Sequence, residues 1–178
     1  MSLPIRVASA GKGVTQVIER CENAKATGYL DLSGCSLMYL ADAIYLVLKG
    51  YDVNKVNLRE NDLKKFPKKL IAKFPNMNVI NIEGNFIEEI PEEISEWKEL
   101  KGLNMANNKI SIFTDSMYGL ESLSILDISG NSIEELDVPR LYSSFPKLIQ
   151  LNVSGNPLKD EIKASLSEHR PKILTIQF

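Results

Sequence analysis

The sequence predicts an α/β fold, a repeat solenoid built on one curved parallel β-sheet. Three observations predict it. The pattern L-x-x-L-x-L-x-x-N-x-L, in which any aliphatic residue replaces Leu, recurs six times along the chain. Its ninth position holds Cys once and then Asn five times, at spacings of 23 to 26 residues. Each copy is too short to bury its apolar face alone, so neighbouring copies must stack into one continuous core.

The six copies define the order of the expected strands. They cover Thr27–Leu37, Val53–Leu63, Met77–Ile87, Leu100–Ile110, Leu123–Ile133 and Leu148–Leu158. Their ninth residues are Cys35, Asn61, Asn85, Asn108, Asn131 and Asn156. Side chains alternate along a strand, so positions four and six point into the solenoid and positions three, five and seven point out. A truncated seventh copy, PKILTIQF, repeats the two inner apolar positions as Leu174 and Ile176.

The segments between the strands are expected to return along the convex side. In the first five copies an apolar residue follows the ninth position by five residues: Leu40, Phe66, Ile90, Phe113 and Leu136. The turn itself is expected to depend on the ninth residue. An Asn side chain both donates and accepts hydrogen bonds, so it can satisfy backbone groups that a bend leaves unpaired.

Both ends of a solenoid need caps. We expect a flexible leader at residues 1–13 and a capping helix at residues 14–26, because Val14, Val17, Ile18 and Cys21 recur at helical spacing. Gly28 is expected to end that helix. The repeats then span residues 27–158. Residues 159–178 form the C-terminal cap, with a short helix at 160–169 and a last parallel strand at 173–178. Residues 14–178 are thus expected to form a single domain.

With these six repeats the chain resembles the leucine-rich repeat family, specifically its short intracellular type, which has about 23 residues per repeat. The six repeats carry the resemblance, which extends from Thr27 to the C-terminus. The departures are Thr27 and Pro171 at aliphatic positions and Cys35 in place of Asn, all near the ends. The resemblance implies a solenoid that binds other proteins on its concave face, with no catalytic residues.

Composition excludes several classes of function. Lys and Arg total 21 against 23 Asp and Glu, which gives a net charge of −2 and argues against nucleic-acid binding. The longest run of aliphatic and aromatic residues, Ile44–Leu48, is too short to span a membrane. MSLPIRVASAGKG lacks the apolar core of a signal peptide. We therefore expect an intracellular, cytoplasmic protein, in which Cys21 and Cys35 stay as free thiols.

No motif indicates catalysis. GKGVT at Gly11–Thr15 lacks the spacing of a phosphate-binding loop. His169 is the only histidine and has no pattern of nucleophile or metal ligands around it. We expect no enzyme activity, no cofactor and no metal site.

Binding is expected on the outward positions of the concave sheet. Position three holds Tyr29, Lys55, Val79, Gly102, Ile125, Gln150 and Ile173. Position five holds Asp31, Asn57, Asn81, Asn104, Asp127, Asn152 and Thr175. Position seven includes Arg59 and Glu83, which contact either a ligand or each other. Val79 and Ile125 flank Gly102 and indicate a modest apolar strip. The position-five column either binds or simply hydrates the sheet.

Two hypotheses follow for function. The first is a non-catalytic interaction module or adaptor, a monomer that binds an unidentified protein or peptide on the concave face. The second is a structural subunit or homodimer that uses the C-terminal edge strand or the convex surface.

Two short stretches of opposite charge pose a separate question. KKFPKK covers Lys64–Lys69 and EEIPEE covers Glu88–Glu93, and the offset of 24 residues matches that of Asn61 and Asn85. They are either two binding patches for partners of opposite charge or one internal seam. The common offset favours the seam, with four facing pairs: Lys64 with Glu88, Lys65 with Glu89, Lys68 with Glu92, and Lys69 with Glu93.

Overall fold

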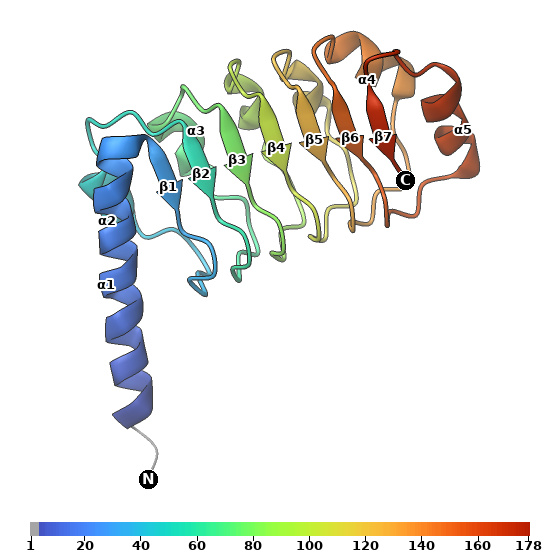
Figure 1. The fold of residues 1–178 in the computed structure, drawn as a ribbon. Coiled ribbons are helices and arrows are strands. Elements are labelled where there is room, and N and C mark those ends of the chain that lie inside the picture. Colours follow the sequence, from blue (N-terminus) through green and yellow to red (C-terminus); the bar gives the residue numbers. More distant parts are fainter. Residues whose placement is uncertain (1–3) are drawn as a thin grey trace.

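Seven parallel strands follow one another in chain order and form one curved sheet (Figure 1). The computed structural model describes residues 4–178. The strands are β1 (Tyr29–Asp31), β2 (Lys55–Asn57), β3 (Val79–Asn81), β4 (Gly102–Asn104), β5 (Ile125–Asp127), β6 (Gln150–Asn152) and β7 (Thr175–Gln177). In the first six strands the residue at position four is at most 1% exposed. The predicted solenoid is therefore confirmed.

Short helical segments line the opposite face. They are α2 (Asp42–Val47), α3 (Lys69–Lys73), the 3-10 helices η1 (Glu92–Glu96) and η2 (Asp115–Gly119), and α4 (Val138–Ser144). The five apolar residues expected on this side are all buried. Trp97 is fully buried at the middle of the solenoid, where its Nε1 donates to the Phe74 carbonyl at 2.9 Å and its ring lies 6.0 Å from that of Phe66.

The asparagine ladder joins each turn to the repeat before it. It consists of Asn61, Asn85, Asn108, Asn131 and Asn156. Nδ2 of Asn85, for example, donates to the carbonyls of Leu58 and Ile82, both at 2.9 Å, while its Oδ1 accepts from the Leu63 N–H at 3.1 Å. The expected role of Asn at the turn is confirmed. Because each amide contacts two repeats, the ladder also fixes which repeats are neighbours.

Position eight, just before the ladder residue, adopts a left-handed backbone in all six repeats. Gly occupies it four times, with φ between 62° and 68°. Glu60 and Asn107 adopt the same conformation at φ values of 55° and 54°. Glycine reaches this region without steric cost, whereas other residues are strained there. The glycine of the repeated SGN and EGN triplets is therefore explained by the left-handed backbone of the turn.

The N-terminal helix begins earlier than expected. α1 spans Pro4–Thr27, so residues 4–13, predicted as a flexible leader, are helical. Proline suits the first turn of a helix, where its missing N–H would have no partner. The first three predicted leader residues lie outside the described residues. Gly28, at φ 68°, donates to the Ala24 carbonyl directly after the helix, and Cys21 is buried against the first repeat.

The C-terminal end combines α5 (Asp160–Glu168) with β7. Leu166 of the helix and Leu174 before the strand are buried. The predicted register of β7 was wrong by two residues. Thr175 pairs with Gln150, so Thr175 rather than Ile173 occupies position three, and Ile176 rather than Leu174 occupies position four. The helix between the sixth and seventh copies interrupts the repeat count, and the seventh copy has no Asn to fix the frame.

The predicted charge seam does not form as four pairs. Within residues 4–178 a single ion pair joins the two stretches, Lys68 Nζ to Glu93 Oε1 at 3.3 Å. Lys69 instead contacts Asp42 of the first repeat at 2.6 Å. Lys64 and Lys65 make no ion pair in the described chain. The return segments also differ, with an α-helix after Lys68 and a 3-10 helix after Pro91. Exposed ion pairs stabilise too little to hold long side chains in one geometry, so the common offset does not produce four pairs.

None of the helices in the described part of the chain has the length and hydropathy needed to cross a membrane.

Candidate protein-binding face

The strand face is the surface formed by positions three, five and seven of the repeats. The predicted residues of the first six repeats lie side by side on it, because each strand pairs with the next at equivalent positions. Position three gives a continuous row across the sheet. Val79 pairs with Gly102, and Gly102 pairs with Ile125. The sequence thus placed this row correctly as far as β6.

Position three supplies the exposed apolar surface. Tyr29, Val79 and Ile125 are exposed at 42%, 39% and 43%. Gly102 separates the last two and leaves a shallow depression. A Cβ added there would meet the two methyl groups of Val79 at 3.5 Å, which is ordinary contact. The depression therefore reflects a missing side chain and does not arise from backbone strain.

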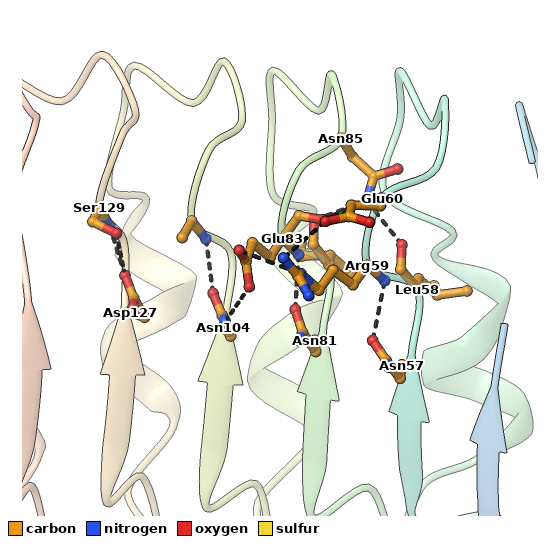
Figure 2. Close-up of polar contacts among 12 residues, drawn as sticks. Asn57, Leu58, Arg59, Glu60, Asn81, Glu83, Asn85, Asn104, Asp127 and Ser129 are labelled. Carbon is orange, nitrogen blue, oxygen red and sulfur yellow. Dashed lines mark hydrogen bonds and ion pairs between the residues drawn. The ribbon is translucent and has the colours of Figure 1, made fainter. Parts of the chain in front are cut away.

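Position five has a structural role that the sequence reasoning missed. The side chain of each residue accepts a hydrogen bond from the N–H two residues later, in all six repeats. Figure 2 shows this bond for Asn57, Asn81, Asn104 and Asp127. Asp and Asn commonly form such turns. The signal in the sequence was the restriction of this column to Asp and Asn in the six complete copies.

The second polar atom of these side chains links neighbouring strands. Asn57 Nδ2 donates to Asp31 at 3.1 Å, and Asn152 Nδ2 donates to Asp127 at 3.0 Å. Asn104 Nδ2 donates to Glu83 Oε2 at 3.1 Å. The column therefore has few free donors or acceptors.

Arg59 and Glu83 contact each other. The Arg59 Nε lies 3.4 Å from Glu83 Oε1, and its NH2 group lies 2.8 Å from Glu60 Oε1. With Asn104 they form a chain of polar contacts beside the apolar row (Figure 2). The sequence had left open whether these two residues meet a ligand or each other. The arrangement holds the Glu83 carboxylate against the sheet, with its side chain only 24% exposed.

The remaining candidates for chemistry are the thiols of Cys21 and Cys35 and the imidazole of His169. Burial raises the pKa of both the Cys21 and the Cys35 thiol, so both are neutral near pH 7 and weakly nucleophilic. Among residues 4–178, no three His, Cys, Asp or Glu side chains lie where they could together hold a metal ion. Gly11–Thr15 lies within α1, and His169 caps the end of α5.

Comparison with known proteins agrees with this architecture. A family model described as leucine rich repeat matches residues 75–133. Leucine-rich repeat-containing protein 20 of Homo sapiens is 30% identical over 95 residues, which cover 51% of this chain and 52% of that protein. PH domain leucine-rich repeat-containing protein phosphatase 1 of Mus musculus is 29% identical over 119 residues, 66% of this chain and 7% of that protein. A solved leucine-rich repeat protein of Leptospira interrogans has a TM-score of 0.68 at 23% identity, over 79% of this chain and 34% of that one.

The parallel sheet, the asparagine ladder and the capping elements define a repeat solenoid. The fold is that of leucine-rich repeat domains, and residues 75–133 match the leucine rich repeat family model. The predicted resemblance to this family is confirmed. The resemblance to leucine-rich repeat-containing protein 20, predicted from LDLSGCSL, AIYLVLK, IEGNFIEEIP and LNVSGNPL taken together, is confirmed as well. The chain spans about half the length of that relative and a small part of the phosphatase.

Proposed function

We propose that this leucine-rich repeat domain is a non-catalytic interaction module that binds a segment of another protein on its strand face. The observation that carries the proposal is the pair of exposed aliphatic residues, Val79 and Ile125, on either side of the Gly102 depression. Exposed apolar groups that are contiguous and edged by polar residues are typical of protein-binding surfaces. We expect the protein to act in the cytoplasm.

The hydrogen bonding of the strand face supports this proposal. A partner that covers the sheet removes water from the position-five side chains, and an unpaired polar group would then cost about 1–3 kcal/mol. Here those side chains already bond to the backbone and to each other. The polar column can therefore be covered at a low desolvation cost, which leaves the apolar contacts at position three to stabilise the complex.

The charge of this face favours a protein or peptide. Arg59 is paired with Glu83, and Lys55 lies beside Val79 in the row at position three. Such a balanced surface gives no excess of cations for a phosphate backbone. The exposed Tyr29 lies in the same row on β1, separated from Val79 by Lys55, and provides a further contact of the type enriched at interfaces.

The test is a paired substitution, Val79→Glu with Ile125→Glu, followed by proximity labelling and co-purification. Partners captured by the wild-type chain should be lost. Gly102→Lys should have the same effect without lowering the Tm, because the site accepts a side chain without strain. The control is Leu46→Glu with Ile112→Glu, two exposed residues outside the strand face. Equal loss in the control, or unchanged capture in the strand-face variants, would place binding elsewhere.

A homodimer is the second candidate. Ile173 and Phe178 are exposed at 70% and 53% beside β7, and within the described residues β7 pairs only with β6. Light scattering at micromolar concentration separates this candidate from the first. A dimer that Ile173→Glu dissociates would support it, and a strict monomer would exclude it.

A further inference from the structure

The two residues after the turn, at positions twelve and thirteen, form a second surface. We call them the rim pair of each repeat. The six rim pairs are Met38-Tyr39, Lys64-Lys65, Glu88-Glu89, Ser111-Ile112, Glu134-Glu135 and Lys159-Asp160. Only the first consists of two large apolar residues. Met38 and Tyr39 are nevertheless exposed at 71% and 69%, so the packing of the solenoid does not explain them.

The backbone holds Met38 and Tyr39 outward. Leu37 before them donates its N–H to Asn61 Oδ1 at 2.9 Å and accepts from the Asp62 N–H at 2.9 Å. Leu40 after them is buried in the core. The segment is therefore fixed on both sides, and the two apolar side chains between are presented to solvent on an ordered backbone.

A groove of about 340 Å³ lies between this pair and the second repeat. Its wall is mainly apolar and includes Tyr45, Phe66 and Pro67 as well as the first rim pair. The charged groups that line it are Lys64, Lys65 and Lys69, with no carboxylate among the lining residues. Asp42 neutralises Lys69, whereas Lys64 and Lys65 stay exposed and without an ion pair in residues 4–178.

We propose that this first-repeat groove, which comprises Met38, Tyr39, Phe66, Lys64 and Lys65, binds an acidic protein segment that carries one apolar anchor side chain. The anchor enters the apolar part of the groove between Tyr39 and Phe66. Its flanking Asp or Glu residues pair with Lys64 and Lys65. The groove lies outside the strand face, so the two binding events are independent.

Charge complementarity determines the occupant. An apolar segment with basic flanks would place like charges against the two lysines, and a neutral segment would leave both unpaired. The adjacent Glu88-Glu89 pair is not among the lining residues and lies on the far side of the lysines from Met38. It limits the cationic surface to the groove and disfavours an acidic segment that extends toward the third repeat.

The experiment selects a random displayed peptide library on the full chain, with parallel selection on three variants. Lys64→Glu with Lys65→Glu tests the charges, and Met38→Ser with Tyr39→Ser tests the apolar wall. Lys101→Glu with Lys147→Glu is the matched control, because it makes the same change in net charge at two exposed lysines elsewhere. Peptides retained by wild type and control but lost by the first two variants are synthesised, and their binding is measured by fluorescence anisotropy.

We expect the groove-dependent peptides to be rich in Asp and Glu around one aromatic or aliphatic residue. Their affinity should fall about tenfold in the Lys64→Glu, Lys65→Glu variant and should weaken as salt is raised. The Val79→Glu, Ile125→Glu variant should bind these peptides with unchanged affinity. A failure of the groove proposal can therefore be distinguished from a failure of the strand-face proposal. A selection that yields no groove-dependent peptide, or only basic or neutral ones, would overturn the proposal.

Discussion

Replacing two neighbouring residues of the asparagine ladder should cost more than the sum of the single replacements. Four strand-end carbonyls, those of Leu58, Ile82, Met105 and Ile128, accept two ladder amides each. The carbonyl of Ile82 bonds Asn85 and Asn108, both at 2.9 Å, and that of Met105 bonds Asn108 and Asn131. A single loss leaves each of these carbonyls with one partner, whereas the loss of two neighbours leaves one carbonyl with none.

The contacts of Asn108 give the magnitude for a single replacement. Asn108→Ala removes the bonds to the Ile82 and Met105 carbonyls, at about 1 kcal/mol each, and leaves the buried Ile87 N–H unpaired at about 1–3 kcal/mol. The expected loss in the free energy of unfolding is about 3–5 kcal/mol. Adding Asn85→Ala leaves the Ile82 carbonyl without a side-chain partner. This adds a coupling energy of about 1–3 kcal/mol.

The control pair is Asn85 with Asn131, which share no carbonyl. Their effects should add within about 0.5 kcal/mol. The assay is urea unfolding followed by circular dichroism, with all variants in the same concentration of a stabilising osmolyte so that the double variants still fold. If the coupling energy were the same for Asn85 with Asn108 as for Asn85 with Asn131, or if the effects were additive in both pairs, the shared carbonyls would not be the cause of the coupling.

Two further substitutions test individual residues. Burial, with a smaller contribution from Asp42, raises the pKa of Tyr45 to about 12. Because the folded pKa lies above the unfolded value of about 10, the stabilisation is present below pH 10 and is lost as pH rises through about 12. Tyr45→Phe should therefore flatten the fall in Tm over this range, whereas Tyr39→Phe, at an exposed position, should not. Glu60→Gly should raise the free energy of unfolding by about 0.5–1 kcal/mol, because it relieves a left-handed backbone at φ 55°. Glu60→Ala, which keeps the strain, is its control, and equal effects of the two would contradict the argument.

The repeat pattern predicted the strands because two signals coincide in each copy. The inner apolar pair fixes which residues face the core, and the ninth residue fixes where the strand ends. Both signals are local in sequence, so they can be recognised without knowledge of the tertiary contacts. Where the second signal is absent, as after Pro171, the register of β7 was misjudged by two residues.

Side-chain pairing was less predictable than backbone register. Lys64 stands at the offset of Glu88, yet long exposed side chains gain too little from pairing to be held in one geometry. The position-five column shows the opposite case. Asp and Asn are short, so their hydrogen bonds to the N–H two residues later follow from the local backbone, and the restricted composition of the column was a readable signal. The exposure of Val79 and Ile125 followed directly from strand alternation.

The position of Trp97 has a practical consequence for measurements on this protein. It is the only tryptophan, and it lies fully buried near the centre of the solenoid. In a repeat array the ends can open while the centre stays folded, because each repeat depends on its neighbours. Intrinsic fluorescence therefore reports on the central repeats, while circular dichroism averages over all of them. If all seven strands unfold cooperatively, the unfolding curves from fluorescence and from circular dichroism will coincide. A separation between the two curves measures the departure from that cooperativity.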